Sequence, residues 1–201
     1  MLWRRPSGAK RRGPLVVILH GNGTDESNLF PLADLFAPDA TIAAPRAPIA
    51  SEGGFRWYAA HDPGRPTADS LADSIARLET WLDTQTATAG SVWLVGFSAG
   101  ALMAGALALR APQRYAGIAM MHGTLPFDAG LPLEPQGLAH ADVFYGYGTN
   151  DAVIPAQLVQ RSVAWLRDES GANAVIREYR AAHEIPLGEA RDLARWYASL
   201  T

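Results

Sequence analysis

The chain has 201 residues, of which 48% are apolar and 18% are charged, and its formal net charge at pH 7 is −3. This composition excludes an intrinsically disordered chain, and the small negative charge gives no general attraction to nucleic acid. Because the chain has no cysteine, disulfides, thiolate catalysis and cysteine-based metal sites are excluded. The length favours a single domain over residues 1–201, without a linker.

A basic cluster near the start of the chain contains Arg4, Arg5, Lys10, Arg11 and Arg12. We interpret it as a solvated, loosely ordered tail, with a contact site for an anionic surface as the alternative. The apolar run that follows is too short for a signal peptide, and no stretch reaches the ~20 apolar residues of a membrane span. We therefore expect a soluble, cytoplasmic protein.

Buried strands and helices alternate along most of the chain. Short β-branched apolar runs predict strands, and apolar residues three and four positions apart predict helices. The predicted strands are 15–19, 41–44, 92–95, 117–121, 143–145 and 174–179, and the predicted helices are 68–84, 99–110, 157–168 and 187–200. The Pro- and Gly-rich stretch 125–137 is predicted to be a loop or a small flap. This order is typical of a parallel sheet covered by helices on both faces.

The pentapeptide Gly96–Gly100 matches the G-x-S-x-G pattern of a nucleophilic serine. It follows the predicted strand 92–95 and precedes the apolar helix that starts at Ala99, which is the strand–turn–helix setting that this chemistry requires. The turn is tight, so side chains at either glycine would collide with the strand or the helix. The pattern predicts Ser98 as the nucleophile, against the alternative of a serine in an ordinary glycine turn.

A serine hydroxyl attacks a carbonyl well only when a base removes its proton. Three histidines follow Ser98 in the chain, namely His122, His140 and His183. His183 lies in a loop beyond the predicted strand 174–179, where ligand-facing groups collect in parallel sheets. We therefore predict His183 as the base, and we interpret His122 as a structural, hydrogen-bonding histidine.

The base needs a carboxylate that holds its tautomer and stabilises its charged form. Asp151 follows the predicted strand 143–145 through a glycine-containing turn, from which it can contact the ring of His183. The alternative is a turn aspartate that binds local backbone. Glu178 and Glu184 are worse placed, because one lies in a strand and the other adjoins the base.

The negative charge of a tetrahedral intermediate needs backbone N–H groups that already point at it. One is expected from Ala99, which follows the nucleophile, and the other from Asn22, in the loop after strand 15–19. A Gly-rich turn without a ligand is the alternative reading of that loop. Phosphate-binding G-x-G-x-x-G and G-K-[ST] motifs are absent, no metal-ligand cluster is visible, and no cofactor is expected.

Five segments in chain order resemble the phospholipase/carboxylesterase family, which includes acyl-protein thioesterases and many bacterial carboxylesterases. They are 19–23, 28–33 with 45–48, 96–100, 148–155 and 183–186. The set spans nearly the whole chain and is specific, although no single piece is. The resemblance implies an α/β-hydrolase fold, and a length of 201 residues leaves little room for a large cap domain. It also implies Ser98, Asp151 and His183 as a catalytic triad, with the amides of Asn22 and Ala99 as the oxyanion hole.

A Phe-Arg-Trp-Tyr segment resembles an Arg-Trp-Phe loop of the family, so Trp57 is a candidate lining of the acyl pocket, with an ordinary buried aromatic as the alternative. Leu125 and Phe127 are candidates for an apolar pocket wall, or they only cover the sheet. Two departures are that Tyr147 stands where the family usually has His, and Ala182 where it usually has Gly. Neither departure removes a catalytic atom.

These features predict a serine hydrolase that cleaves carboxylic esters of short to medium acyl chain through an acyl-enzyme. The expected partner is a small-molecule ester, and the expected state is a monomer or a homodimer. Thioesterase and lysophospholipase activities stay open, because the same triad serves all three reactions. A catalytically inactive binding module with this fold is the alternative from another class.

Overall fold

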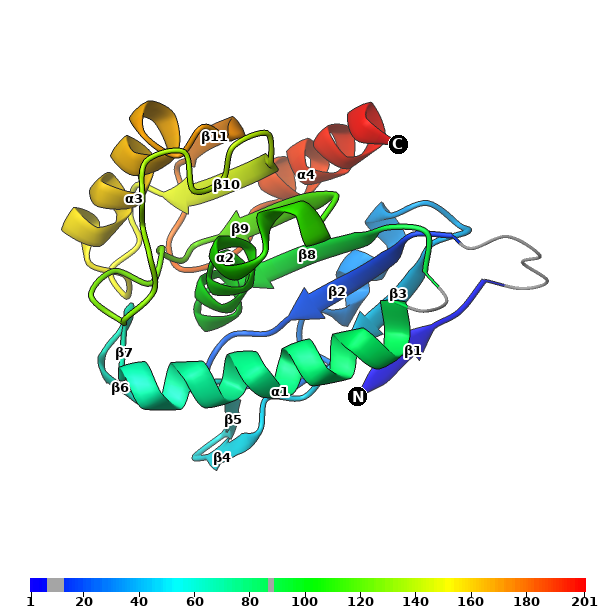
Figure 1. Ribbon diagram of the computed structural model, residues 1–201, viewed down its shortest axis with the longest axis horizontal. Coiled ribbons are helices and arrows are strands. Elements are labelled where there is room, and N and C mark those ends of the chain that lie inside the picture. Colours follow the sequence, from blue (N-terminus) through cyan, green and yellow to red (C-terminus); the bar gives the residue numbers. More distant parts are fainter. Residues whose placement is uncertain (7–12, 87–88) are drawn as a thin grey trace.

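The computed structural model describes residues 1–6, 13–86 and 89–201, and its centre is a seven-stranded sheet (Figure 1). The strand order is β1-β3-β2-β8-β9-β10-β11. The strands are β1 Leu2–Arg4, β2 Leu15–Leu19, β3 Thr41–Ala44, β8 Val92–Phe97, β9 Gly117–Met121, β10 Asp142–Gly148 and β11 Asn173–Tyr179. Each neighbouring pair is parallel except β1 with β3, which is antiparallel.

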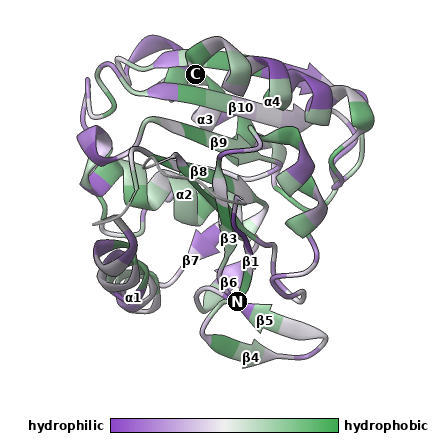
Figure 2. Cartoon of the chain, turned by 90° about the vertical axis from the view of Figure 1, so that its right-hand side faces the viewer, coloured by the Kyte–Doolittle hydropathy of each residue, from purple (hydrophilic) through white to green (hydrophobic). Residues whose placement is uncertain are grey.

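Helices cover both faces of this sheet, as Figure 2 shows with α1 and α2 on one side and α4 on the other. The helices are α1 Ala68–Thr86, α2 Ala99–Arg110, α3 Ala156–Asp168 and α4 Leu187–Leu200, with short 3-10 helices η1 Phe30–Leu35 and η2 Pro112–Arg114. In β2, Leu15, Val17 and Leu19 join the apolar cluster beneath α1, α2 and α3, whereas Val16 and Ile18 join the cluster beneath α4 and η1. The predicted α/β-hydrolase fold class is confirmed.

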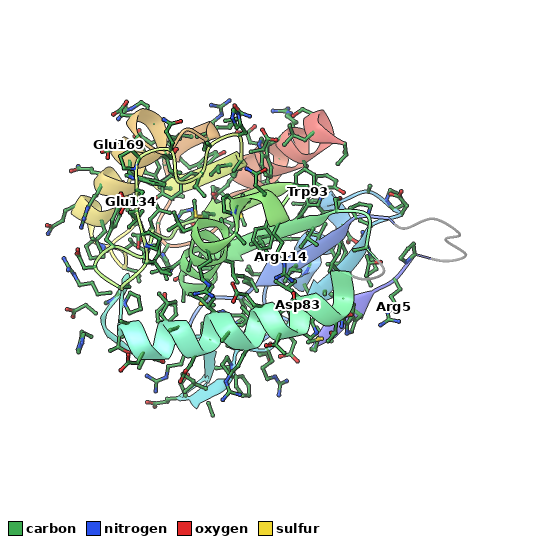
Figure 3. The ribbon with its side chains drawn as sticks, in the orientation of Figure 1. Arg5, Asp83, Trp93, Arg114, Glu134 and Glu169 are labelled. Atoms are coloured by element: carbon green, nitrogen blue, oxygen red, sulfur yellow. The ribbon has the colours of Figure 1, made fainter. Side chains whose placement is uncertain are left out.

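Helix α2 is the central helix, and all its residues except Arg110 are buried. Two ion pairs join the end of α2 and the following η2 to α1. Arg110 Nε of α2 lies 2.9 Å from Glu79 Oε1. Arg114 Nη2 of η2 lies 2.6 Å from Asp83 Oδ1, and both of these residues are labelled in Figure 3. Such partly exposed pairs contribute roughly 0–1 kcal/mol each. Apolar packing on both sides of α2 therefore holds the helix that carries the serine turn.

The start of the chain forms a strand rather than the expected loose tail. Leu2 pairs with Ala44 of β3, and Arg4 Nη2 donates a hydrogen bond of 3.2 Å to the carbonyl of Ala37. Trp3 also packs against Trp81 of α1, with ring centroids 6.0 Å apart. The tail prediction is wrong here because apolar residues cover an open sheet edge. The predicted cluster's Lys10, Arg11 and Arg12 lie outside the described residues.

Two small hairpins between β3 and α1 were not predicted. They are β4 Ile49–Ser51 with β5 Gly54–Arg56, and β6 Ala60–Asp62 with β7 Arg65–Pro66. Strands of two or three partly exposed residues give no periodic apolar signal. The predicted strand 143–145 also continues to Gly148. Within the described ranges, no helix combines the length and the apolar character needed to cross a bilayer.

Candidate active site

Ser98 lies in a strained turn between β8 and α2. Its backbone angles are φ 56° and ψ −118°, a conformation that residues other than glycine rarely adopt. A Cβ at Gly96 would lie 2.2 Å from the carbonyl oxygen of Gly100, and a Cβ at Gly100 would lie 2.0 Å from that of Leu19. The turn therefore closes only with glycine at both positions, which agrees with the strand–turn–helix setting predicted for the motif.

Ser98, His183 and Asp151 form a continuous hydrogen-bonded chain. Ser98 Oγ lies 2.9 Å from His183 Nε2, and His183 Nδ1 lies 2.8 Å from Asp151 Oδ2. With Nδ1–H donating to the carboxylate, Nε2 is free to accept the serine proton. The chain arises because Ser98 follows β8, Asp151 follows β10 and His183 follows β11, all at the carboxyl edge of parallel strands.

The carboxylate of Asp151 is held from both of its oxygens. Oδ1 accepts hydrogen bonds from the amides of Val153 at 2.9 Å and Ile154 at 3.1 Å, while Oδ2 faces His183. Burial raises the pKa of Asp151, but the hydrogen bonds from His183 and from the two amides lower it further than burial raises it. The net pKa lies below the usual value, so Asp151 is ionised at neutral pH.

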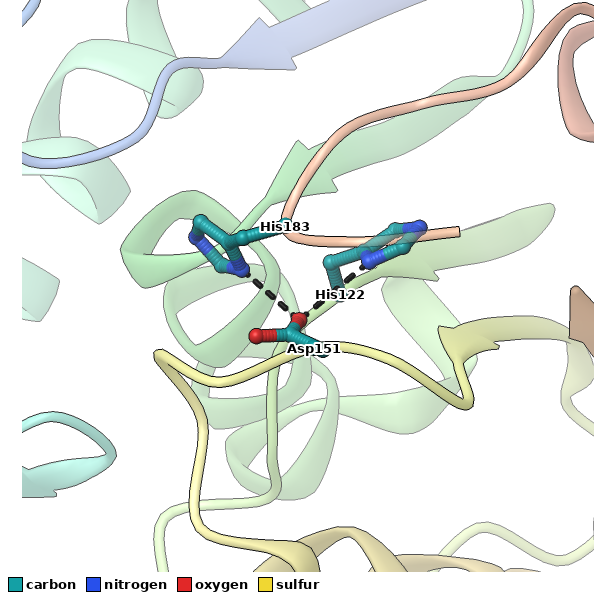
Figure 4. A group of neighbouring side chains, drawn as sticks. All are labelled: His122, Asp151 and His183. Atoms are coloured by element: carbon teal, nitrogen blue, oxygen red, sulfur yellow. Dashed lines mark hydrogen bonds and ion pairs between the residues drawn. The ribbon is translucent and has the colours of Figure 1, made fainter. Parts of the chain in front are cut away.

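A second imidazole contacts the same carboxylate oxygen. His122 Nδ1 lies 3.3 Å from Asp151 Oδ2, so the two rings converge on one atom (Figure 4). On its other side, His122 Nε2 lies 3.0 Å from Oε2 of Glu189, in the first turn of α4. Both side chains are fully buried. His122 is thus a hydrogen-bonding histidine, as the sequence suggested, whereas Glu189 gave no signal, because a charged residue near a helix start is normally solvated.

His122, Asp151 and His183 also place potential metal-ligand atoms within 4.8 Å of one another. Both Nδ1 atoms, however, point at a single carboxylate oxygen, and the remaining nitrogens contact Ser98 and Glu189. Hydrogen bonds therefore account for the four nitrogens of the two rings.

The loop that carries Asn22 is fixed through His20. The amide of Ala47 donates to His20 Nε2 at 3.1 Å, His20 Nδ1 contacts the carbonyl of Gly21 at 2.8 Å, and the indole of Trp57 donates to the carbonyl of His20 at 2.8 Å. Burial lowers the pKa of His20, which agrees with a neutral ring that accepts a hydrogen bond at Nε2.

Asn22 and Ala99 line one cavity together with Ser98 and His183. Among the described residues, no backbone carbonyl accepts a hydrogen bond from the amide of Asn22 or of Ala99. The amide of Ala99 is one of the first in α2, which intrahelical bonds leave open. Both residues thus lie at the cavity wall with no backbone acceptor for their amides among the described residues.

The cavity has a volume of about 380 Å³. It is lined by Asn22, Arg56, Tyr58, Ala60, His61, Asp62, Pro63, Gly64, Ser98, Ala99, Leu102, Thr124, Val153, Ile154 and His183. Much of its wall comes from the β6–β7 hairpin, which sequence reasoning missed. The Asp-Pro-Gly run at 62–64 is a turn signature that could have revealed it.

Three expected pocket residues lie in the core, outside the lining of this cavity. Trp57 is 1% exposed, and its indole N–H is bound to the carbonyl of His20. Leu125 and Phe127 are also buried in the cluster beneath the helices. For Trp57, the alternative of a buried aromatic is the one that the structure shows, because its polar edge finds a partner inside.

The parallel sheet with the serine turn between β8 and α2 is the architecture of the α/β-hydrolase fold, and the comparison with family models identifies the chain as a hydrolase. The chain belongs to the Phospholipase/Carboxylesterase family, whose model matches residues 6–199.

Three relatives illustrate this similarity. The Bacillus subtilis (strain 168) protein named "Putative hydrolase MhqD" is 26% identical over 187 residues, which cover 91% of this chain and 92% of that protein. The structure of a carboxylesterase from Mesorhizobium loti is 29% identical with a TM-score of 0.82, covering 95% of this chain and 90% of the other. The Bacillus cereus carboxylesterase has a TM-score of 0.86 at 22% identity, covering 100% and 93%, which shows the shared fold.

Proposed function

We propose that the protein hydrolyses carboxylic esters of short to medium acyl chain, with Ser98 as nucleophile, His183 as base and Asp151 as the carboxylate that orients the base. The observation that carries this proposal is the hydrogen-bonded chain from Asp151 through His183 to Ser98, which ends in a cavity. Family membership and the similarity to a carboxylesterase at 29% identity support it.

The reaction has two halves. In the first, His183 Nε2 takes the hydroxyl proton while Ser98 Oγ bonds to the ester carbonyl carbon. The resulting oxyanion accepts hydrogen bonds from the backbone N–H groups of Asn22 and Ala99. His183 then gives the proton to the leaving alcohol oxygen as the carbon–oxygen bond breaks, leaving Ser98 acylated. In the second half, His183 takes a proton from water, the hydroxide attacks the acyl carbon, and the proton returns to Ser98 as the acid leaves. This chemistry uses no cofactor.

The size of the cavity supports compact substrates. Binding cavities for small molecules span roughly 300–1,000 Å³, and about 380 Å³ lies near the lower end of that range. Apolar groups such as Leu102 and Ile154 provide surface for an acyl chain, while Arg56 and His61 make the lining partly polar. Thioesters and lysophospholipids carry the same reacting carbonyl and remain the alternative substrates.

The test is hydrolysis of a p-nitrophenyl ester series from acetate to dodecanoate by the wild type, Ser98→Ala and Ser199→Ala. Ser199 is a matched control, because it lies in α4 outside the cavity lining and its hydroxyl donates to the carbonyl of Trp196 in the same helix. We expect kcat to peak at a short or medium ester, to fall by roughly 10⁵-fold or more in Ser98→Ala, and to stay unchanged in Ser199→Ala. Asp151→Asn should lower kcat by roughly 10⁴-fold, because it disturbs the tautomer of His183.

An acyl-coenzyme A series with a thiol-detecting reagent measures the thioester alternative on the same variants. A fluorophosphonate probe, which labels an activated serine independently of the ester, should label the wild type and leave Ser98→Ala unlabelled. Ester hydrolysis that persists in Ser98→Ala would refute the proposal, and so would a folded wild type that neither cleaves esters nor takes the probe.

A further inference from the structure

The hydrogen-bonded chain does not end at Asp151. Its Oδ2 atom accepts from His183 at 2.8 Å and faces Nδ1 of His122 at 3.3 Å (Figure 4). The other ring nitrogen of His122, Nε2, lies 3.0 Å from Glu189 Oε2. Five side chains therefore run in line from Ser98 to the interior, and the last two are fully buried. A buried carboxylate costs several kcal/mol unless it is paired, so this pair needs an explanation.

The fold makes specific room for His122 and Glu189. A Cβ at Gly146 would lie 1.9 Å from Glu189 Oε1, and a Cβ at Gly148 would lie 2.9 Å from Cε1 of His122. The backbone of His122 is left-handed, with φ 48°, and its amide donates to the carbonyl of Gly146 at 2.8 Å. The ring also packs against Phe97, with centroids 5.7 Å apart. Together these contacts fix the orientation of the ring toward Asp151.

The proton count follows from this geometry. A neutral imidazole carries one N–H, so a ring of His122 that donates from Nδ1 to Asp151 has only a lone pair at Nε2. In the other neutral tautomer, Nε2–H faces Glu189 and the lone pair of Nδ1 faces the ionised Asp151 at 3.3 Å, so a single proton always leaves one repulsive contact between lone pairs. A second proton, held by the ring and Glu189, removes that repulsion and directs Nδ1–H at Asp151.

The charges around the pair favour keeping that proton. Burial lowers the pKa of His122, but the hydrogen bonds and charges of Glu189 and Asp151 raise it by more. Burial raises the pKa of Glu189, which contact with His122 only partly offsets and the charge of Asp192 on the same helix increases. Both directions hold a proton in the pair.

We propose that His122, held by Glu189, is a positioning residue that keeps a second N–H donor on Asp151 Oδ2. This inference rests on the proposed function and extends it. With two donors on Oδ2 and two amides on Oδ1, the carboxylate cannot rotate away from His183. Neither residue lines the cavity, so the effect of the pair is on the alignment of the base with Ser98.

The test compares His122→Leu with His122→Asn. Leucine removes the donor, whereas the amide nitrogen of asparagine can occupy the place of Nδ1 and donate to Asp151. We expect His122→Leu to lower kcat by about tenfold to a hundredfold with KM within twofold, since small misalignments act on the chemical step. Removing a donor also strengthens Asp151 as an acceptor, so the acid limb of the kcat/KM profile should move up by roughly half a pH unit.

His122→Asn should recover kcat to within about threefold of the wild type, although its melting temperature falls because Glu189 loses its partner. That separation of activity from stability is what a merely structural histidine would not give. A value of kcat in His122→Leu within threefold of the wild type overturns the inference, as does an equal loss in both variants.

If His122→Leu does not fold, the kcat values of Glu189→Leu and Glu189→Gln are compared to test the positioning role. Glutamine can donate to Nε2 of His122, whereas leucine leaves that nitrogen without a partner, so we expect Glu189→Gln to exceed Glu189→Leu in kcat by about tenfold. Equal kcat values overturn the inference.

The labelling rate of Ser98 with a fluorophosphonate gives the same comparison without an ester. An unlabelled wild type or an active Ser98→Ala variant refutes the proposed function. A reactive wild type with unaffected His122 and Glu189 variants refutes only the positioning role.

Discussion

Replacing Gly100 with alanine tests the packing that creates the serine turn. The new Cβ would lie 2.0 Å from the carbonyl oxygen of Leu19, whereas ordinary contacts begin at 3.4 Å, so α2 and β2 must separate by about 1.4 Å. Overpacking of this kind costs roughly 1–3 kcal/mol or more. For a chain of this size, about 3 kcal/mol lowers the melting temperature by roughly 6–12 °C. The shift also moves the amide of Ala99, and a displacement of about 1 Å can lower kcat by roughly a hundredfold.

Thermal unfolding and p-nitrophenyl acetate hydrolysis of Gly100→Ala measure both effects. Gly188→Ala is the matched control, because an added Cβ there has no atom within 4 Å and the residue lies exposed in the first turn of α4. Alanine is the better helix former by about 0.5–1 kcal/mol, so the control should melt at the same temperature or up to roughly 4 °C higher. A Gly100→Ala variant with the melting temperature and kcat of the wild type would refute the reasoning.

Three further changes probe other parts of the site. Trp57→Phe removes the indole donor to the buried carbonyl of His20, so the free energy of unfolding measured in urea should fall by about 1–3 kcal/mol. The value of kcat for ester hydrolysis should fall as well, and an unchanged unfolding midpoint would contradict this. Burial raises the pKa of Glu26, but the hydrogen bonds from Arg46 at 2.6 Å and from the N-terminal ammonium of Met1 together outweigh it, and the pKa falls to about 2. The ionised form therefore stabilises the fold above pH 4.5, and this contribution is lost as the pH falls toward 2. Glu26→Gln should therefore lower the free energy of unfolding by about 1–3 kcal/mol at pH 7. In thermal scans, the difference in melting temperature between variant and wild type should shrink below pH 4.5, and a constant difference down to pH 2 would be inconsistent with this. Arg56 lines the cavity, so Arg56→Gln should raise KM by roughly twofold to fivefold for an ester that carries a carboxylate, with a neutral ester of the same length unchanged, and equal effects on both esters would speak against a charge contact.

The inner strands of the central sheet could be predicted from the sequence because they are buried on both faces. Val16 and Val17 face opposite apolar clusters, so the run 15–19 is apolar at every position, which is the pattern that predicts a strand in a parallel sheet. The segments that escaped prediction, β1 and the β4–β5 and β6–β7 hairpins, are short and partly exposed. β1 is held by pairing with β3 and by the packing of Trp3 on Trp81 of α1, which are contacts between distant segments that no local sequence pattern records.

The grouping of Ser98, Asp151 and His183 could be predicted, because side chains after parallel strands meet at one sheet edge. Glu189 could not be predicted, since its burial depends on the space that Gly146 leaves on a strand more than forty residues away in the chain. The position of Trp57 was equally ambiguous, because the partner of its indole is a backbone carbonyl, which leaves no trace in the sequence.

Because the strands β2, β3, β8, β9, β10 and β11 are parallel, their carboxyl ends form one rim of the sheet and their amino ends form the opposite rim. The residues that line the cavity come after the carboxyl ends of strands in the central sheet. The segments 111–116 and 169–172 lead into the amino ends of β9 and β11, at the opposite rim. A five-residue strand separates the two rims by roughly 16 Å. We therefore expect that a peptide inserted at 111–116 or 169–172, or attachment to a surface through these segments, leaves the spacing of Ser98, His183 and Asp151 unchanged.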